Sequence, residues 1–271
     1  MKRILILLFL VITGFGYAQV KETRQVETFT KLSFRVPGKL ILKQGSSQSV
    51  VLSGDKDMLE KIETEVSGGH LSIEIPAKWA LRNWHWRDEN KITAYVTVKD
   101  IEAISVSGSG DLESDGKILS NDMELRVSGS GSLTIDLDAK GELRADVSGS
   151  GDITAKGSCR EFESHVSGSG KVNLTCAISG KADVGVSGSG RISMNGRANE
   201  IKAHISGSGK VLASDLEVSK CDVRISGSGD VEINVKDALD ANISGSGSVS
   251  YKGNPSQVNS HSSGSGKVRK M

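Results

Sequence analysis

The sequence predicts an all-β fold, a parallel β-solenoid with about 20 residues per coil and an irregular N-terminal cap. Three observations predict it. A Ser-Gly-Ser-Gly tetrapeptide recurs along the last two-thirds of the chain, an aliphatic residue precedes most copies, and another aliphatic residue follows every copy at the same distance. We expect a single-stranded, right-handed β-helix, in which every coil repeats the path of the previous one.

The tetrapeptide occurs nine times, at intervals of 18 to 21 residues. The residues assigned to this structural repeat include Ser107, Gly108, Ser109, Gly110, Ser128, Gly129, Ser148, Gly149, Ser167, Gly168, Ser187, Gly188, Ser206, Gly207, Ser226 and Gly227, and further copies begin at Ser244 and Ser263. A flexible Gly/Ser linker would share this composition, but it would not carry regular aliphatic flanks. The regular flanks therefore indicate folded repeats.

Two apolar columns flank the tetrapeptide. The residue before it is Val106, Val127, Val147, Val166, Val186, Ile205, Ile225 or Ile243, and only Ser262 breaks the series. The residue five places after its first serine is Leu112, Leu133, Ile153, Val172, Ile192, Val211, Val231, Val249 or Val268. Polar residues alternate with these columns, which is typical of half-buried strands. Stacking successive coils would bury both columns in one continuous core.

The same alternation places both glycines of each tetrapeptide inside and both serines outside, where the serines could bond to one another along the rod. Glycine removes side-chain bulk where the chain bends or approaches a neighbour closely. The opposite orientation, with the serines inside, stays open. A third apolar column lies five residues before the tetrapeptide and includes Phe162 and Cys221. The three cysteines, Cys159, Cys176 and Cys221, fall in different columns, so we expect free thiols.

Residues 1–18 have the pattern of a cleavable signal peptide. Lys2 and Arg3 precede an apolar run from Ile4 to Ile12, and Ala18 follows as a small residue suited to cleavage. The run is shorter than the roughly 20 residues that span a bilayer, and the mature chain has no other apolar stretch of that length. We therefore expect export to the periplasm, the outer-membrane surface or the extracellular space.

Residues 19–105 lack the tetrapeptide but keep the strand pattern, and residues 106–271 hold the regular repeats. The expected N-terminal strands are Leu32–Val36, Lys39–Lys43, Val50–Leu52, Leu71–Ile75 and Ile92–Val98. A short helix is expected over 57–64, with Asp55 or Asp57 as its N-cap. We interpret this region as the first irregular turns and the cap, because terminal repeats protect the sheet edge.

The segment 77–90 holds all three tryptophans of a chain that is poor in aromatic residues. The candidate binding residues in it are Trp79, Arg82, Trp84, His85, Trp86 and Arg87. Trp and Arg concentrate binding energy at interfaces, and the indole face stacks on sugars or bases. The same rings could instead plug the end of a narrow core, and the sequence leaves both interpretations open.

Charge and spacing argue against several kinds of site. The formal net charge of +1 gives no reason to expect nucleic acid as a partner. His165 and His204 share an outward column but should lie two rungs apart, too far for one metal ion. Asp follows three tetrapeptides and Lys or Arg follows four, which excludes a calcium ladder. We expect no cofactor, no metal and no catalytic residues.

The N-terminal pattern also carries a family resemblance. Phe29 to Gly38, Val51 to Asp55, Leu59 to Val66 and Leu71 to Ile75, followed by Val-Ser-Gly-Ser-Gly-Asp repeats, resemble the putative auto-transporter adhesin, head GIN domain family of Bacteroidetes-type bacteria. The resemblance implies a parallel β-helical fold, export to the envelope or surface, and an adhesive role. It supplies no catalytic residues.

The leading hypothesis is therefore an exported, non-catalytic solenoid that binds an envelope or surface component. A glycan is one candidate partner, contacted through a flat sheet face or the tryptophan segment. A carbohydrate-active enzyme and a purely structural envelope protein stay as alternatives. Neither the ligand nor the oligomeric state follows from the sequence.

Overall fold

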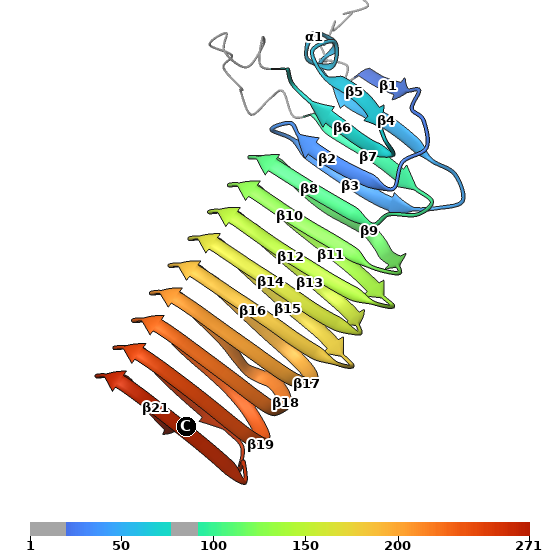
Figure 1. The fold of residues 1–271 in the computed structure, drawn as a ribbon. Coiled ribbons are helices and arrows are strands. Elements are labelled where there is room, and N and C mark those ends of the chain that lie inside the picture. Colours follow the sequence, from blue (N-terminus) through green and yellow to red (C-terminus); the bar gives the residue numbers. More distant parts are fainter. Residues whose placement is uncertain (1–19, 77–91) are drawn as a thin grey trace, which may run out of the picture.

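The computed structural model describes residues 20–76 and 92–271 and is almost entirely β-structure, with 75% strand and 2% helix. The chain forms a β-solenoid of about 8 turns with about 20 residues per coil, which confirms the predicted fold class. Figure 1 shows the strands stacked along a rod, with the N-terminal strands at one end and the C-terminal strands at the other. No described helix has the length and apolar character needed to cross a membrane.

Each coil contributes one strand to each of two stacks, which we call the first and second sheets. From the N-terminal end, the first sheet contains β5 (Glu63–Ser67), β6 (His70–Glu74), β2 (Lys31–Arg35), β8 (Ala103–Gly108), β10 (Met123–Gly129), β12 (Glu142–Gly149), β14 (Glu161–Gly168), β16 (Lys181–Gly188) and, at the far end, β21 (Gln257–Gly264). Each tetrapeptide forms the corner that follows a first-sheet strand.

The second sheet contains β1 (Val20–Arg24), β4 (Ser49–Gly54), β7 (Thr93–Val98), β3 (Lys39–Gln44), β9 (Asp111–Ser120), β11 (Ser132–Ala139), β13 (Asp152–Cys159), β15 (Lys171–Ile178), β20 (Ser248–Lys252) and β22 (Lys267–Lys270). Three longer strands, β17 (Arg191–Gly207), β18 (Lys210–Gly227) and β19 (Asp230–Gly245), cross from the second sheet into the first. In these coils the second corner is a bend within one strand.

The register of the first sheet stacks like residues on like. Val127 pairs with Val106 on one side and with Val147 on the other, and Val147 pairs with Val166. All four valines are buried. The aliphatic column that precedes the tetrapeptide therefore forms a dry spine, as the sequence predicts, because the alternation of period 2 turns every second side chain inward.

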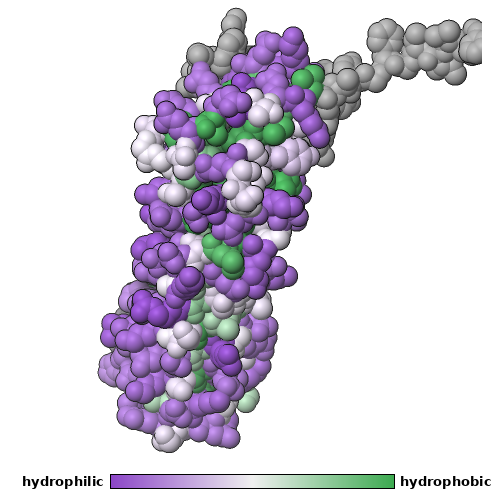
Figure 2. Space-filling model, turned by 90° about the vertical axis from the view of Figure 1, so that its right-hand side faces the viewer, coloured by the Kyte–Doolittle hydropathy of each residue, from purple (hydrophilic) through white to green (hydrophobic). Residues whose placement is uncertain are grey.

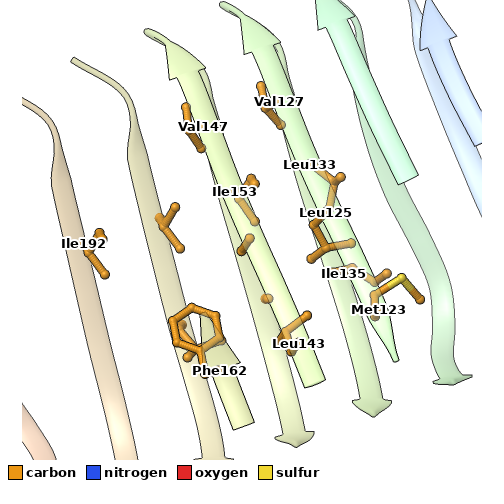
Figure 3. Close-up of a cluster of buried hydrophobic side chains, with 14 of the residues drawn as sticks. Met123, Leu125, Val127, Leu133, Ile135, Leu143, Val147, Ile153, Phe162 and Ile192 are labelled. Carbon is orange, nitrogen blue, oxygen red and sulfur yellow. The ribbon is translucent and has the colours of Figure 1, made fainter. Parts of the chain in front are cut away.

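Side chains from both sheets fill the space between them. Figure 3 shows Leu125 and Leu143 from the first sheet, and Leu133 and Ile153 from the second, among the side chains of this core. Phe162 pairs with Leu143 on one neighbour and with Ala182 on the other, so a large ring adjoins a small side chain. The small Ala182 side chain leaves room for the Phe162 ring, so the narrow core stays filled at this coil.

The N-terminal end changes strand direction. Strands β2, β6, β3 and β7 continue the two sheets in parallel, whereas β5 pairs antiparallel with β6, and β1 and β4 also pair antiparallel. A single helical turn, α1 (Lys56–Leu59), buries Met58 and Leu59 at this end. The Asp55 side chain accepts the Asp57 N–H at 2.9 Å, so Asp55 is the N-cap.

The predicted extent of this helix, 57–64, is wrong. The helix ends at Leu59, and β5 already begins at Glu63. Burial of Ile62 and pairing of Val66 with Leu71 in the β5–β6 hairpin override the helical pattern. Tertiary pairing commonly outweighs weak helix propensity in so short a segment.

The two glycines of each tetrapeptide serve different purposes. In the copy that begins at Ser128, Ser128 and Ser130 are exposed, Gly131 is buried and Gly129 is half-buried. Gly129 has a φ of 114°, which L-residues rarely adopt. Gly131 has an ordinary φ, but a Cβ there would lie 2.2 Å from the Gly110 carbonyl oxygen. One glycine supplies the turn and the other permits close stacking.

Candidate functional site: an axial groove

The predicted tryptophan site lies outside the described residues. Trp79, Arg82, Trp84, His85, Trp86 and Arg87 all fall between β6 and β7 in a segment that the structure does not describe. The tetrapeptide residues, in contrast, are all described and lie at the corners of successive coils. Their recorded hydrogen bonds join main chains, for example from Ser150 N–H to the Gly129 carbonyl at 2.8 Å. These residues build the scaffold.

Polar side chains cluster at the starts of the first-sheet strands from β10 to β18. In each of these coils a buried residue of the third apolar column, such as Met123, Phe162 or Ile201, lies between two outward residues. Because the coils stack in register, these outward residues form two columns parallel to the rod axis. One column holds Asp122, Glu142, Glu161, Lys181, Glu200 and Lys220, and the other holds Glu124, Arg144, Glu163, Asp183, Lys202 and Asp222.

Three hollows follow these columns along one edge of the rod, with volumes of about 740, 230 and 320 Å³. Glu142 borders the first and second hollows, while Glu200 and Lys202 border the second and third. The three hollows therefore adjoin one another along this edge, from Thr30 to Asn259, and we call them together the axial groove. Figure 2 views this edge and shows less hydrophilic residues in a band flanked by hydrophilic ones.

Carboxylates outnumber basic groups in every section of the axial groove. Arg144 bridges two coils, with its Nε 2.9 Å from an Asp146 oxygen and its Nη2 3.0 Å from a Glu163 oxygen. Burial and the neighbouring Glu163 carboxylate raise the pKa of Glu142 above its usual value. The groove is thus elongated and net acidic, with charged side chains along its sides and less hydrophilic residues between them.

The outward histidines do not meet one another. Strand register pairs His165 with Gly185 and Gly185 with His204, so one rung separates the two imidazoles. The His165 ring lies against Gly185, where a Cβ would be 2.7 Å from Nδ1. Within residues 20–76 and 92–271, no group of three or more His, Cys, Asp or Glu side chains is placed to hold a metal ion.

Comparison with solved structures supports the architecture. A crystal structure from Parabacteroides distasonis described as a "putative lipid binding protein" has 21% sequence identity and a TM-score of 0.69, with coverage of 93% of this chain and 96% of the other. A "putative adhesin" from Parabacteroides merdae has 18% identity, a TM-score of 0.70 and coverage of 95% and 98%. A second "putative adhesin" from Parabacteroides distasonis has 20% identity, a TM-score of 0.59 and coverage of 94% and 97%. These likenesses show the shared fold.

The sequence itself identifies the family. No curated protein matches the chain. The family model described as "Putative auto-transporter adhesin, head GIN domain" matches residues 28–195 and 174–255, which covers most of the N-terminal end and nearly all of the repeats. The chain therefore belongs to the putative auto-transporter adhesin, head GIN domain family.

Proposed function

We propose that this protein is exported and that it binds an extended envelope or surface component, in an adhesive rather than a catalytic role. The axial groove carries the proposal, because it crosses coil after coil and could accommodate a polymer along the rod. The family and the solved structures described as putative adhesins support the adhesive role. The signal-peptide pattern of residues 1–18 supports export.

The chemistry of the groove favours a glycan. Carboxylates, amines and the Arg144 guanidinium accept from or donate to sugar hydroxyls, and a polymer would meet similar groups on each coil. An acyl chain, in contrast, would leave these charged groups without water or polar partners. A lipid-binding role, as in the description of one solved structure, therefore suits the described groove less well.

A second contact surface is proposed at the N-terminal end, where the segment with Trp79, Trp84 and Trp86 joins β6 to β7. Indole rings stack on sugar faces, so we propose this segment as a contact separate from the groove, because it follows the end of β6 whereas the groove follows the starts of the first-sheet strands. Replacement of the tryptophans tests this contact separately from the groove.

One observation favours the enzymatic alternative enough to test it. Glycoside hydrolases use two carboxyl groups, one of which has a raised pKa, and Glu142 with its neighbour Glu163 meets that description. Arg144 bonds to Glu163 at 3.0 Å and occupies one of its oxygens, which fits an ion-pair network better than a nucleophile. Release of reducing sugar ends by the wild-type chain, and its loss in Glu142→Gln, would establish catalysis.

The binding experiment uses a glycan array with the purified full-length chain and two charge-reversal variants. Glu161→Lys with Asp183→Lys changes exposed groups of the groove. The matched control, Asp136→Lys with Glu232→Lys, changes outward groups of the second sheet. We expect the groove variant to lose at least tenfold in affinity and the control to bind as wild type.

A third variant, with Trp79, Trp84 and Trp86 replaced by alanine, shows whether any binding that the groove variant retains depends on the tryptophan segment. Proteolysis of intact producing cells tests exposure on the surface. Absence of binding to every glycan, combined with absence of the protein from the envelope and the medium, would overturn the proposal.

A further inference from the structure

Two of the three cysteines meet in the core, although they lie in different columns. Cys159 ends β13 and Cys176 lies in β15, the next strand of the second sheet. Cys159 pairs directly with Ile178, and Gly157 pairs directly with Cys176, so the two cysteines are diagonal neighbours. All three cysteines are free thiols in the structure, as predicted, but the sulfur atoms of Cys159 and Cys176 are only 3.6 Å apart and both side chains are buried. Sequence columns alone miss this contact, because diagonal neighbours can still touch.

Glycines on both neighbouring coils make the contact possible. Cys176 pairs with Gly157 on one side and with Gly196 on the other, so no side chain stands directly beside it in the ladder. Both glycines have positive φ, 141° and 125°. A Cβ at Gly157 would lie 1.6 Å from the Leu137 carbonyl oxygen. The backbone at this corner therefore requires glycine, and the space beside Cys176 is left to the Cys159 sulfur.

We propose that Cys159 and Cys176 form a disulfide that joins the coil of β13 to the coil of β15 when the chain folds in the presence of a disulfide oxidant. A disulfide requires the sulfurs to approach to about 2.05 Å. The two sulfurs therefore have about 1.5 Å to close from their separation of 3.6 Å. The inference does not rest on the proposed binding function, because it concerns the scaffold.

The chemistry balances with a small-molecule disulfide such as oxidised glutathione. One cysteine thiolate attacks a glutathione sulfur, which forms a mixed disulfide and releases one glutathione thiolate. The second cysteine then attacks the protein sulfur of the mixed disulfide, which forms the Cys159–Cys176 bond and releases the second glutathione. Two electrons pass to the oxidant, and the two cysteine protons end on the two glutathione thiols.

This exchange should occur while the coils are still assembling. The hydrogen bond to Cys176, together with burial, raises the pKa of the Cys159 thiol in the folded chain, which disfavours the reactive thiolate. Exposed thiols of the unfolded or partly folded chain react more readily, and stacking then brings the two sulfurs together. Once formed, the bond would be shielded by the core from reductants.

Cys221 provides an internal control. It lies in the first sheet, pairs with Ile201 and Leu239, and is buried among apolar side chains. Burial raises the pKa of this thiol to about 12. We expect Cys221 to remain a free thiol under conditions in which the other two cysteines are oxidised.

The test refolds the full-length chain from denaturant in buffers of reduced and oxidised glutathione, alkylates the remaining thiols under denaturing conditions, and maps tryptic peptides without reduction. Cleavage after Lys156, Arg160, Lys171 and Lys181 separates the cysteines into peptides 157–160 and 172–181. The expected result is a linked pair of these peptides, lighter than their sum by two hydrogen atoms, with Cys221 alkylated.

A second measurement asks whether the bond stabilises the fold. Closure of a short loop by a disulfide restricts the unfolded chain, so oxidised wild type should melt about 5 to 10 °C above the reduced form. Cys159→Ser should abolish both the linked peptide and the redox-dependent shift, whereas Cys221→Ser should keep both. Recovery of Cys159 and Cys176 fully alkylated from folded, oxidant-treated wild type would overturn the proposal, as would a linkage to Cys221.

Discussion

Gly149 lies directly above Gly129 in the corner stack, and a Cβ on Gly149 would lie 2.7 Å from the Gly129 carbonyl oxygen. The φ of Gly149 is 112°, so this position is closed to other residues for conformational as well as steric reasons. The same relationship repeats from coil to coil, because each tetrapeptide sits on the previous one.

Gly149→Ala should therefore lower the free energy of unfolding by about 3 kcal/mol or more, as strain in φ and a backbone clash combine. Two control substitutions separate these effects in urea unfolding. Gly68→Ala changes a glycine with φ of 58° and open space, and should cost about 1 kcal/mol. Gly151→Ala changes a glycine of ordinary φ that adjoins Gly131 and Val127, and isolates the clash. Equal stability of Gly149→Ala and wild type would contradict the stacked corner.

Phe162→Ala should be among the most damaging core substitutions. The ring is buried and its neighbour Ala182 is too small to fill the space, so a cavity would remain. We expect a loss of about 3 to 5 kcal/mol, measured by urea unfolding. Leu119→Ala is the control, because the Leu119 side chain is 59% exposed and should matter little. A loss below about 1 kcal/mol at Phe162 would mean that the narrow core can collapse around the missing ring.

Gln44 joins strand β3 to the end of β9 through three hydrogen bonds. Its side-chain oxygen accepts the Leu119 N–H at 2.8 Å, and its amide nitrogen donates to the carbonyls of Lys99 and Leu119 at 3.0 Å. Gln44→Ala should reduce the hydrogen-exchange protection of the Leu119 amide by about tenfold, since about 1.4 kcal/mol of protection corresponds to that factor.

Gln44→Glu provides the matched variant. A carboxylate keeps the acceptor for Leu119 N–H but loses the two donors, so protection of the Leu119 amide should persist while overall stability falls. Loss of protection in both variants to the same extent would show that the donors, not the acceptor, hold this segment.

Acid should weaken the contact between β9, β11 and β13. Hydrogen bonds from Lys117 at 2.8 Å and from Ser158 at 2.6 Å lower the pKa of Asp138. A carboxyl group whose pKa is lower in the folded than in the unfolded chain adds stability above the unfolded pKa, about 3.9, and that stability is lost as pH falls through the folded value.

Wild type should therefore melt above Asp138→Asn near neutral pH, and the difference should shrink as acid protonates Asp138, below the unfolded pKa of about 3.9. Thermal unfolding followed by circular dichroism across this range provides the measurement. Ser158→Ala removes one of the two hydrogen bonds and should retain part of the dependence. A difference in Tm that stays constant from neutral pH to pH 2 would rule out the linkage.

Much of the fold follows from local sequence patterns. Val127, Val147 and Val166 stack in the predicted register. Each valine directly precedes a tetrapeptide, so stacking equivalent positions of successive coils is the simplest way to bury all three. The N-terminal end was harder to predict. Antiparallel pairing of β5 with β6 depends on contacts with the rest of the fold, and a short amphipathic stretch such as 57–64 is compatible with either helix or strand.

The candidate site was less predictable than the scaffold. The axial groove depends on the positions that the second corner of each coil gives to polar side chains. The alternation of polar and apolar residues in the sequence does not show whether such side chains line a groove or a flat face. The contact between Cys159 and Cys176 depends on Gly157, whose missing side chain opens a diagonal path. Aligning the repeats shows which residues are direct neighbours in the ladder. A contact between residues of different columns can be found only when the path of the backbone is known.

The uniform register has a further consequence for how such proteins change in length. In the first sheet, each coil between Val127 and Ile243 presents the same Val or Ile followed by Ser-Gly to both neighbours, because these residues pair with their equivalents at every step. Excision of residues 148–166 would join Val147 to Ser167, a junction that already exists between Val166 and Ser167. Duplication or loss of a single unit would thus lengthen or shorten the rod without a new fold, so that its length would be set by the number of repeats.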